Sequence, residues 1–168
     1  SGGQDSLTCL GVALNDHSKV HAIGFSYGQR HSIELVQASK ICQANDVPFQ
    51  VFSIPALQAL EDSALLTDGD VSANHHRNKN LPASFVPNRN ALFLTTAHAY
   101  AQKVGAKTIY TGVCQTDYSG YPDCRLDFIK RLQEALNVGY QTDIIIETPM
   151  MFLDKAQTFE LARKVGFL

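Results

Sequence analysis

The chain opens with SGGQDSLTCLGVAL, residues 1–14, in which a glycine-rich turn runs straight into an apolar segment. Two adjacent glycines allow positive φ angles and a close approach of the backbone to a ligand, and the leucines that follow recur at helical spacing. The first N–H groups of a helix and the positive end of its dipole favour a phosphate group. The stretch therefore predicts a phosphate-binding turn at the start of a helix. The alternative is a glycine turn in which Ser1 or Asp5 only caps the helix.

Helical and strand-like segments alternate along the chain after this turn. Parallel strands need crossover helices and are buried on both faces, so short apolar strands that alternate with amphipathic helices are typical of an α/β protein. We predict a doubly wound, mostly parallel sheet with helices on both faces, of the Rossmann-like type. The strand-like segments are 20–27, 49–54, 107–114 and 144–149, and the helical segments are 6–14, 31–46, 90–106, 123–139 and 154–166.

Local signals mark the ends of several of these helices. Gly105 and Gly139 follow apolar helical patterns, and we expect a helix to end at each of them. Asp154 and Gln157 have the spacing of a capping box at a helix start. The polar stretch 67–80 predicts a mobile loop or lid, and the alternative is a linker between domains.

The start of the chain lacks one part of the predicted sheet. A turn such as SGGQDS is normally fed by an apolar strand, and none precedes Ser1. A sheet without that strand would leave neighbouring backbone groups unpaired. We therefore expect the natural protein to begin earlier, and we expect residues 1–168 to form a single nucleotide-binding domain.

Composition narrows the class of ligand. The formal net charge is −2, with 14 Lys and Arg against 16 Asp and Glu, and no basic run predicts a nucleic-acid or anionic membrane surface. No apolar stretch approaches the length of a spanning helix, so we expect a cytoplasmic protein with a small-molecule ligand. None of the 4 cysteines lies in a C-x-x-C pair, and Cys9 and Cys42 are expected to be small buried apolar residues.

Polar loops follow the strand-like segments at the edge where a doubly wound sheet binds its ligands, outside the carboxyl ends of the strands. Tyr27, Gln29 and Arg30 follow the segment 20–27, although Arg30 alone is equally well explained as a surface residue. The longer loop at 115–125 contains acids, tyrosines and an arginine.

The opening hexapeptide matches the S-G-G-x-D-S signature of the PP-loop family, which splits ATP between its α- and β-phosphates. Further blocks at 25–31 (FSYGQRH), 85–94 (FVPNRNALFL), 112–125 (GVCQTDYSGYPDCR) and 147–158 (ETPMMFLDKAQT) resemble, in order and spacing, those of the 7-cyano-7-deazaguanine synthase family of queuosine-precursor synthesis. The resemblance extends from Ser1 to about the end of the chain. It implies a fold of the adenine nucleotide alpha hydrolase type and an ATP-dependent carbon–nitrogen ligase.

The reaction implied by this resemblance converts 7-carboxy-7-deazaguanine and ammonia to 7-cyano-7-deazaguanine, through an adenylylated carboxylate and an amide, with release of AMP and pyrophosphate. Asp5 would repel phosphate, so its implied partner is Mg²⁺, and the alternative is a plain helix cap. Lys155 lies in a first helical turn, where a cation opposes the dipole, and this is easier to understand if it faces phosphate. Asp5, Ser6 and Lys155 are thus the expected catalytic residues.

ATP binding is assigned to the opening turn, to residues that follow the segment 20–27, and to Arg89. The opening turn supplies backbone and hydroxyl donors to phosphate, and Arg89 is placed to meet an anionic ligand, although a capping turn alone also explains PNRN. The expected ATP-binding residues are Ser1, Gly2, Gly3, Gln4, Asp5, Ser6, Tyr27, Gln29, Arg30 and Arg89.

The substrate is assigned to the loop at 115–125. The ring N–H and amine groups of the substrate need a carboxylate acceptor, for which Asp117 and Asp123 are the candidates. The carboxylate of the substrate needs a cation, for which Arg125 is the candidate. Tyr118 and Tyr121 are candidate stacking faces. For Asp123 an N-cap on the helix that follows is an equally good interpretation.

Two further expectations come with the resemblance. Members of the family carry a cysteine cluster that binds structural zinc beyond the point at which this chain stops, so no zinc ligand is assigned here and a zinc-binding C-terminal lobe is expected outside it. A homodimer is also expected.

Two other classes of protein were weighed against this interpretation. A nucleotide sensor of the universal-stress type places its glycine loop late in the chain, whereas here the loop comes first. A PP-loop tRNA-modifying ligase or sulfurtransferase should show a basic face or a catalytic C-x-x-C, and neither is present.

Overall fold

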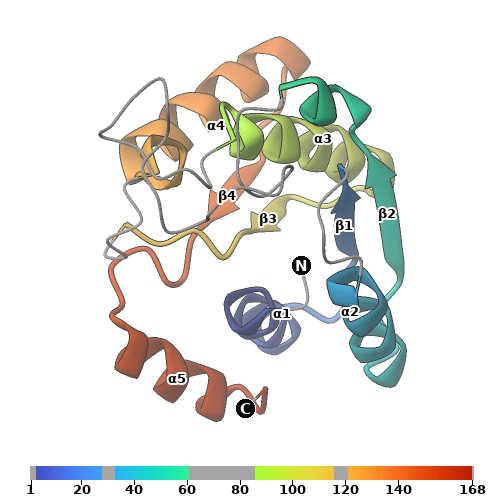
Figure 1. Ribbon diagram of the computed structural model, residues 1–168, viewed down its shortest axis with the longest axis vertical. Coiled ribbons are helices and arrows are strands. Elements are labelled where there is room, and N and C mark those ends of the chain that lie inside the picture. The colour runs from blue at the N-terminus through green and yellow to red at the C-terminus, as the bar shows by residue number, and fades with distance from the viewer. Residues whose placement is uncertain (1–2, 28–32, 61–85, 116–120, 168) are drawn as a thin grey trace. The chain divides into compact units, whose positions relative to one another are not determined.

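The structure is a computed structural model of the chain and describes residues 3–27, 33–60, 86–115 and 121–167 (Figure 1). These residues divide into two compact units. The polar stretch 67–80, which the sequence predicts to be a loop or lid, lies outside the described residues.

One unit contains a parallel pair of strands. β1 (Ala22–Ser26) pairs with β2 (Phe49–Ser53) in a register that matches Ala22 with Phe49 and Ser26 with Ser53. The crossover between them contains α2 (Ile33–Ala44), which buries Ala38 and Cys42, and η1 (Pro55–Leu60) follows β2. Gly24 lets the layers approach closely, because a Cβ there would lie 2.8 Å from Leu35 and from Phe49.

The second unit also contains a parallel pair. β3 and β4 run in a register that matches Thr108 with Ile145 and Tyr110 with Glu147. Each pair of described strands is therefore parallel and connected through helices, which confirms the predicted α/β class. The elements of this unit are α1 (Gln4–Asp16), α3 (Arg89–Val104, from Asn90 on), β3 (Thr108–Tyr110), η2 (Pro122–Cys124), α4 (Leu126–Tyr140), β4 (Ile145–Glu147) and α5 (Lys155–Lys164).

The core of the second unit is built by helices, a strand and loops together. Leu94 of α3, Ile129 of α4 and Ile146 of β4 pack with Val113 and Met151. The last two belong to segments that follow β3 and β4. These segments are therefore anchored by apolar packing, and β3 and β4 are shorter than the predicted segments 107–114 and 144–149 because the chain leaves the strand pairing early.

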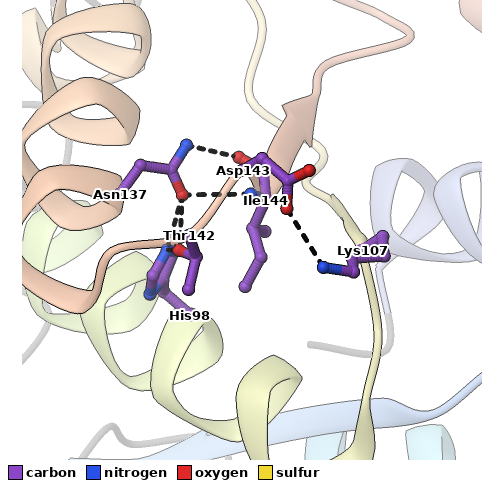
Figure 2. A network of polar contacts seen from close by, with 6 residues as sticks. All are labelled: His98, Lys107, Asn137, Thr142, Asp143 and Ile144. Atoms are coloured by element: carbon purple, nitrogen blue, oxygen red, sulfur yellow. Dashed lines mark hydrogen bonds and ion pairs between the residues drawn. The ribbon is translucent and has the colours of Figure 1, made fainter.

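Side chains of α4 cover the backbone of β4. Gln133 Oε1 accepts a hydrogen bond from the Ile146 N–H at 2.6 Å. Asn137 makes two bonds to Ile144: Oδ1 accepts from the Ile144 N–H at 3.0 Å, and Nδ2 donates to the Ile144 carbonyl at 2.8 Å (Figure 2). The buried ring of His98 completes this network, with Nε2 3.0 Å from Asn137 Oδ1. The network fixes the approach to β4 at its amino end.

The structure confirms two of the predicted helix termini and contradicts a third. Gly105 follows α3 with φ +73°, and Asp154 and Gln157 form the predicted capping box at the start of α5. The prediction that a helix ends at Gly139 is wrong, because α4 continues to Tyr140 and Gln141 takes the left-handed conformation instead. Among the described residues, no helix combines the length and the apolar character needed to cross a membrane.

Candidate functional site

The first turn of α1 begins at a residue without a side chain. Gly3 is the N-cap, with extended backbone angles, and its carbonyl accepts a hydrogen bond from the Leu7 N–H at 3.1 Å. A serine, aspartate or asparagine at this position would accept from the N–H groups of the first turn, whereas glycine cannot. The helix predicted after the glycine turn is confirmed, and its start carries an exposed acid, Asp5, followed by half-buried Ser6. Ser1 and Gly2 lie outside the described residues.

One turn further along α1, Cys9 is buried with 5% of its surface exposed. Burial raises the pKa of the Cys9 thiol to about 12, and the negative charge of Asp5 adds to the rise. The side chain is therefore a neutral thiol at physiological pH and acts as a small apolar residue, as predicted for Cys9 and for Cys42.

Gln4, a predicted ATP ligand, has partners within the protein. Its Nε2 donates to the Phe167 carbonyl at 3.3 Å and lies 3.5 Å from Thr8 Oγ1. The side chain thus ties the start of α1 to the residues after α5. Its role toward ATP stays a prediction.

The segment after β3 passes close to the first turn of α1. A Cβ placed on Gly112 would lie 3.2 Å from the Asp5 carbonyl carbon and 3.2 Å from Asp5 Cβ. Gly112 was not among the predicted site residues; its only signal in the sequence is a glycine inside the predicted strand segment 107–114, where glycine can mark a close approach of backbone.

Asp123 is buried, with 6% of its surface exposed, and accepts a hydrogen bond from the Asn90 N–H at 3.1 Å. Asn90 Nδ2 in turn lies 3.4 Å from the Asp123 carbonyl and 3.3 Å from Cys124 Sγ. The carboxylate thus satisfies the first turn of α3. The alternative in which Asp123 caps the helix that follows it is wrong, because the N-cap of α4 is Arg125.

A second long-range cap serves α4. Gln115 Oε1 accepts from the Leu126 N–H at 3.2 Å, and the Gln115 N–H donates to the Met151 carbonyl at 2.9 Å. Gln115 was not among the predicted residues, since no local pattern marks a cap that acts between distant segments. Arg125 itself is exposed.

Arg89 and Tyr121 come together. The guanidinium carbon of Arg89 lies 5.9 Å from the centroid of the Tyr121 ring, the geometry of a cation–π contact. The sequence assigned the arginine to ATP and the tyrosine to the substrate, and the structure makes them neighbours.

The remaining predicted residues are spread over the fold. Tyr27 directly follows β1 and is half-buried, and Lys155 is the exposed first residue of α5, next to the N-cap Asp154. No group of three or more His, Cys, Asp or Glu side chains is gathered within the described part of the chain. Gln29, Arg30, Asp117 and Tyr118 lie outside the described residues.

Comparison with known proteins gives a consistent result. A family model described as queuosine biosynthesis protein QueC matches residues 1–168. The 7-cyano-7-deazaguanine synthase of Wolinella succinogenes is 51% identical over 170 aligned positions, which span the whole chain and 73% of that protein. The proteins of the same name from Helicobacter pylori (strain HPAG1) and Helicobacter acinonychis are 49% and 48% identical, and the chain spans 75% and 76% of their lengths.

Proposed function

The chain belongs to the queuosine biosynthesis protein QueC family and is an enzyme of queuosine-precursor synthesis, and from this premise we propose the reaction and the roles of its residues. The enzyme converts 7-carboxy-7-deazaguanine and ammonia to 7-cyano-7-deazaguanine and consumes ATP. The observation that carries the ATP chemistry is the start of α1, where SGGQDS places a side-chain-free N-cap, Gly3, before a helix. A nucleotide sensor and a tRNA-modifying ligase gain no support from the comparisons.

The reaction needs activation because a carboxylate is a poor electrophile. A carboxylate oxygen of the substrate attacks the α-phosphorus of ATP, the bond to pyrophosphate breaks, and an acyl-adenylate forms. Ammonia then adds to the carbonyl carbon, loses a proton and expels AMP to leave the amide. The amide oxygen then attacks the α-phosphorus of a second ATP and expels pyrophosphate, and loss of AMP and of both protons from the amide nitrogen gives the nitrile.

The start of α1 holds the pyrophosphate that leaves. Backbone N–H groups from Gly3 onward and the hydroxyl of Ser6 donate to phosphate oxygens, and they are fixed before the reaction begins. The exposed carboxylate of Asp5 in this turn fits Mg²⁺, a hard cation that is commonly bound by one or two carboxylates together with substrate phosphates. Such an ion would neutralise charge that develops on the phosphates.

The other residues bind and orient the two substrates. Lys155 meets phosphate through its ammonium group, while Tyr27, Gln29, Arg30 and Arg89 hold the nucleotide. For the deazaguanine ring we assign the acceptor role first to Asp117, because the carboxylate of Asp123 already accepts from Asn90. Tyr118 and Tyr121 offer stacking faces, and Arg125 offers a fork for the substrate carboxylate.

The finer properties of the assembly are part of the same proposal. The enzyme acts in the cytoplasm as a homodimer on small molecules. Zinc is assigned no ligand among the residues of this chain, and no step of the reaction passes through it.

Product analysis tests the reaction. The full-length enzyme is incubated with ATP, Mg²⁺, ammonium and 7-carboxy-7-deazaguanine, and nucleotides are separated by ion-exchange chromatography. We expect AMP and pyrophosphate, formed only when the carboxylated base is present. Formation of ADP, or AMP release that does not depend on the base, would contradict the proposal.

A further inference from the structure

Residues at and after β3 contact α1 near both of its ends. Toward the C-terminal end of the helix, the Tyr110 hydroxyl donates to Asp16 Oδ2 at 2.9 Å, and His17 Nε2 lies 3.1 Å from the same hydroxyl. The rings of His17 and Tyr110 also meet edge to face, with centroids 5.7 Å apart. Hydrogen bonds and a ring contact therefore link this end of α1 to Tyr110 of β3.

Near the N-terminal end of α1, Gly112 lies close to the backbone of Asp5. A Cβ on Gly112 would lie 3.2 Å from the carbonyl carbon and Cβ of Asp5 and 3.3 Å from its carbonyl oxygen. Carbon atoms in ordinary contact are about 3.5 to 4.0 Å apart. A side chain of any size at Gly112 would therefore push the first turn of α1 away by a few tenths of an ångström, while Tyr110 holds the other end.

Two other glycines of the described residues, Gly139 and Gly11, offer a comparison with Gly112. At Gly139 in α4 a Cβ would meet nothing within 4 Å. At Gly11, in the middle of α1, a Cβ would meet the side chain of Val165 and would lie 2.7 Å from Phe167 Cδ2. The neighbours of that Cβ are side-chain atoms of Val165 and Phe167, whereas two of the three nearest to a Cβ on Gly112 are backbone atoms of the first turn of α1.

The backbone angles of Gly112 are not the reason for glycine. Its φ lies outside the left-handed range that favours glycine, and the same holds for Gly139. An alanine at either position therefore avoids the strain of a left-handed backbone and gains a little stability by restricting the unfolded chain, and only at Gly112 does it also change a close spacing.

We infer that Gly112 is a positioning residue, which sets the place of the first turn of α1 relative to the end of β3 and thereby the place of the ATP phosphates. The inference rests on the proposed function, because it takes that turn to be the phosphate site. Preorganised N–H groups lose much of their effect when they are displaced, and misplacement by about 1 Å can cost about 100-fold in rate. A displacement of a few tenths of an ångström should cost roughly tenfold in kcat/KM for ATP.

The test uses Gly112→Ala, with Gly139→Ala as the matched control and Gly11→Ala as the control for packing of α1. Steady-state pyrophosphate release, with each substrate varied in turn, and the thermal melting temperature are measured on the full-length enzyme. We expect Gly112→Ala to lower kcat/KM for ATP about tenfold with little change in the KM for the carboxylated base. Gly139→Ala should match the wild type, and Gly11→Ala should lower the melting temperature more than it alters the use of ATP.

The outcomes separate the inference from the function on which it rests. If wild-type enzyme turns over and Gly112→Ala has the same kinetic constants, Gly112 does not position the phosphate turn. The same conclusion follows if Gly112→Ala fails to fold. It also follows if the loss of kcat/KM for ATP, relative to the loss of melting temperature, is the same in Gly112→Ala as in Gly11→Ala. If wild-type enzyme releases no pyrophosphate with the base, the proposed function fails and the inference fails with it.

Discussion

The helices α1 and α5 pack on each other but begin in opposite ways. At the start of α5, Asp154 Oδ1 accepts from the Gln157 N–H at 2.8 Å, and Gln157 Oε1 accepts from the Asp154 N–H at 2.9 Å. At the start of α1 the N-cap is Gly3, which has no side chain to take part in such a pair. The first turn of α5 is capped by side chains of its own residues, whereas the N-cap of α1 offers no side chain to its first turn.

Under the proposed function, this difference separates a structural helix start from one that binds phosphate. The N–H groups of a first turn must be satisfied by a cap, by water or by a ligand. A capping box, as at α5, satisfies the N–H groups of Asp154 and Gln157 and places a carboxylate at the helix start, which disfavours a phosphate there, so Lys155 acts through its ammonium group. A glycine cap gives up that stability and leaves the helix dipole available to an anion.

The largest effect is expected for Asp5→Asn at the start of α1. Asp5 lies in the first turn and is not the N-cap, so asparagine there costs only the interaction of the charge with the helix dipole, about 0.3 to 1 kcal/mol, and the melting temperature should stay close to that of the wild type. The loss of charge from the Mg²⁺ site should slow pyrophosphate release at least about 100-fold. Full activity of Asp5→Asn would reduce Asp5 to a structural residue and remove the contrast between the two helices.

A second effect is expected at Asp123, which satisfies the first turn of α3. Asp123→Ala leaves the partly buried Asn90 N–H without its acceptor and should lower the free energy of unfolding by about 1 to 3 kcal/mol in urea denaturation. Asp123→Asn keeps an oxygen acceptor and should retain both stability and, in calorimetric titration, binding of the carboxylated base. Loss of base binding in a stable Asp123→Asn protein would show that Asp123 also reads the substrate.

A third effect concerns the capping box of α5. Asp154→Ala should lower the free energy of unfolding by about 1 kcal/mol, and Asp154→Asn should lower it much less. Pyrophosphate release per folded molecule should be unchanged in both variants. A loss of activity without a loss of stability would mean that the start of α5 is functional as well.

The smallest effect is expected at the other end of α1, where Tyr110 bonds Asp16. Burial of the ring raises the pKa of Tyr110 to about 12 from 10.0, and the hydrogen bond to Asp16 and its negative charge add to the rise. Because the folded state then holds this proton more tightly than the unfolded state, the stabilisation is present below pH 10 and is lost as the pH rises toward 12.

Tyr110→Phe removes this contribution. Its free energy of unfolding should be lower than that of the wild type by about 1 kcal/mol at neutral pH. The difference between the two proteins should shrink as the pH rises from 10.0 to about 12. The difference is measured by urea denaturation at each pH. A constant difference over that range would mean that the hydrogen bond donated by the Tyr110 hydroxyl does not stabilise the fold.

Local patterns in the sequence predict the features that depend on near neighbours. The capping box at Asp154 and Gln157 and the left-handed Gly105 are both confirmed, because each is set by residues a few positions apart. The parallel strands are confirmed for the same reason, since alternation of apolar strands with helices limits the possible connections. At the site, local pattern predicts the helix that begins after the glycine turn.

Contacts between distant segments account for what the sequence does not predict. Gln115 caps α4 and Asp123 satisfies α3 from other segments, and neither arrangement leaves a local signature. The close approach of Gly112 to Asp5 depends on how β3 and α1 pack. The proposed binding roles depend on ligands, which no pattern of neighbouring residues defines.

Backbone amide chemical shifts, recorded while a non-hydrolysable ATP analogue and Mg²⁺ are titrated into the full-length protein, test the central claim most directly. If the glycine-capped start of α1 binds the phosphates, the amide shifts of residues 3–7 should change most and should saturate with the analogue. The amides at the closed start of α5, residues 155–158, should change much less. Large changes at 155–158 with none at 3–7 would contradict the assignment of α1 as the phosphate-binding helix.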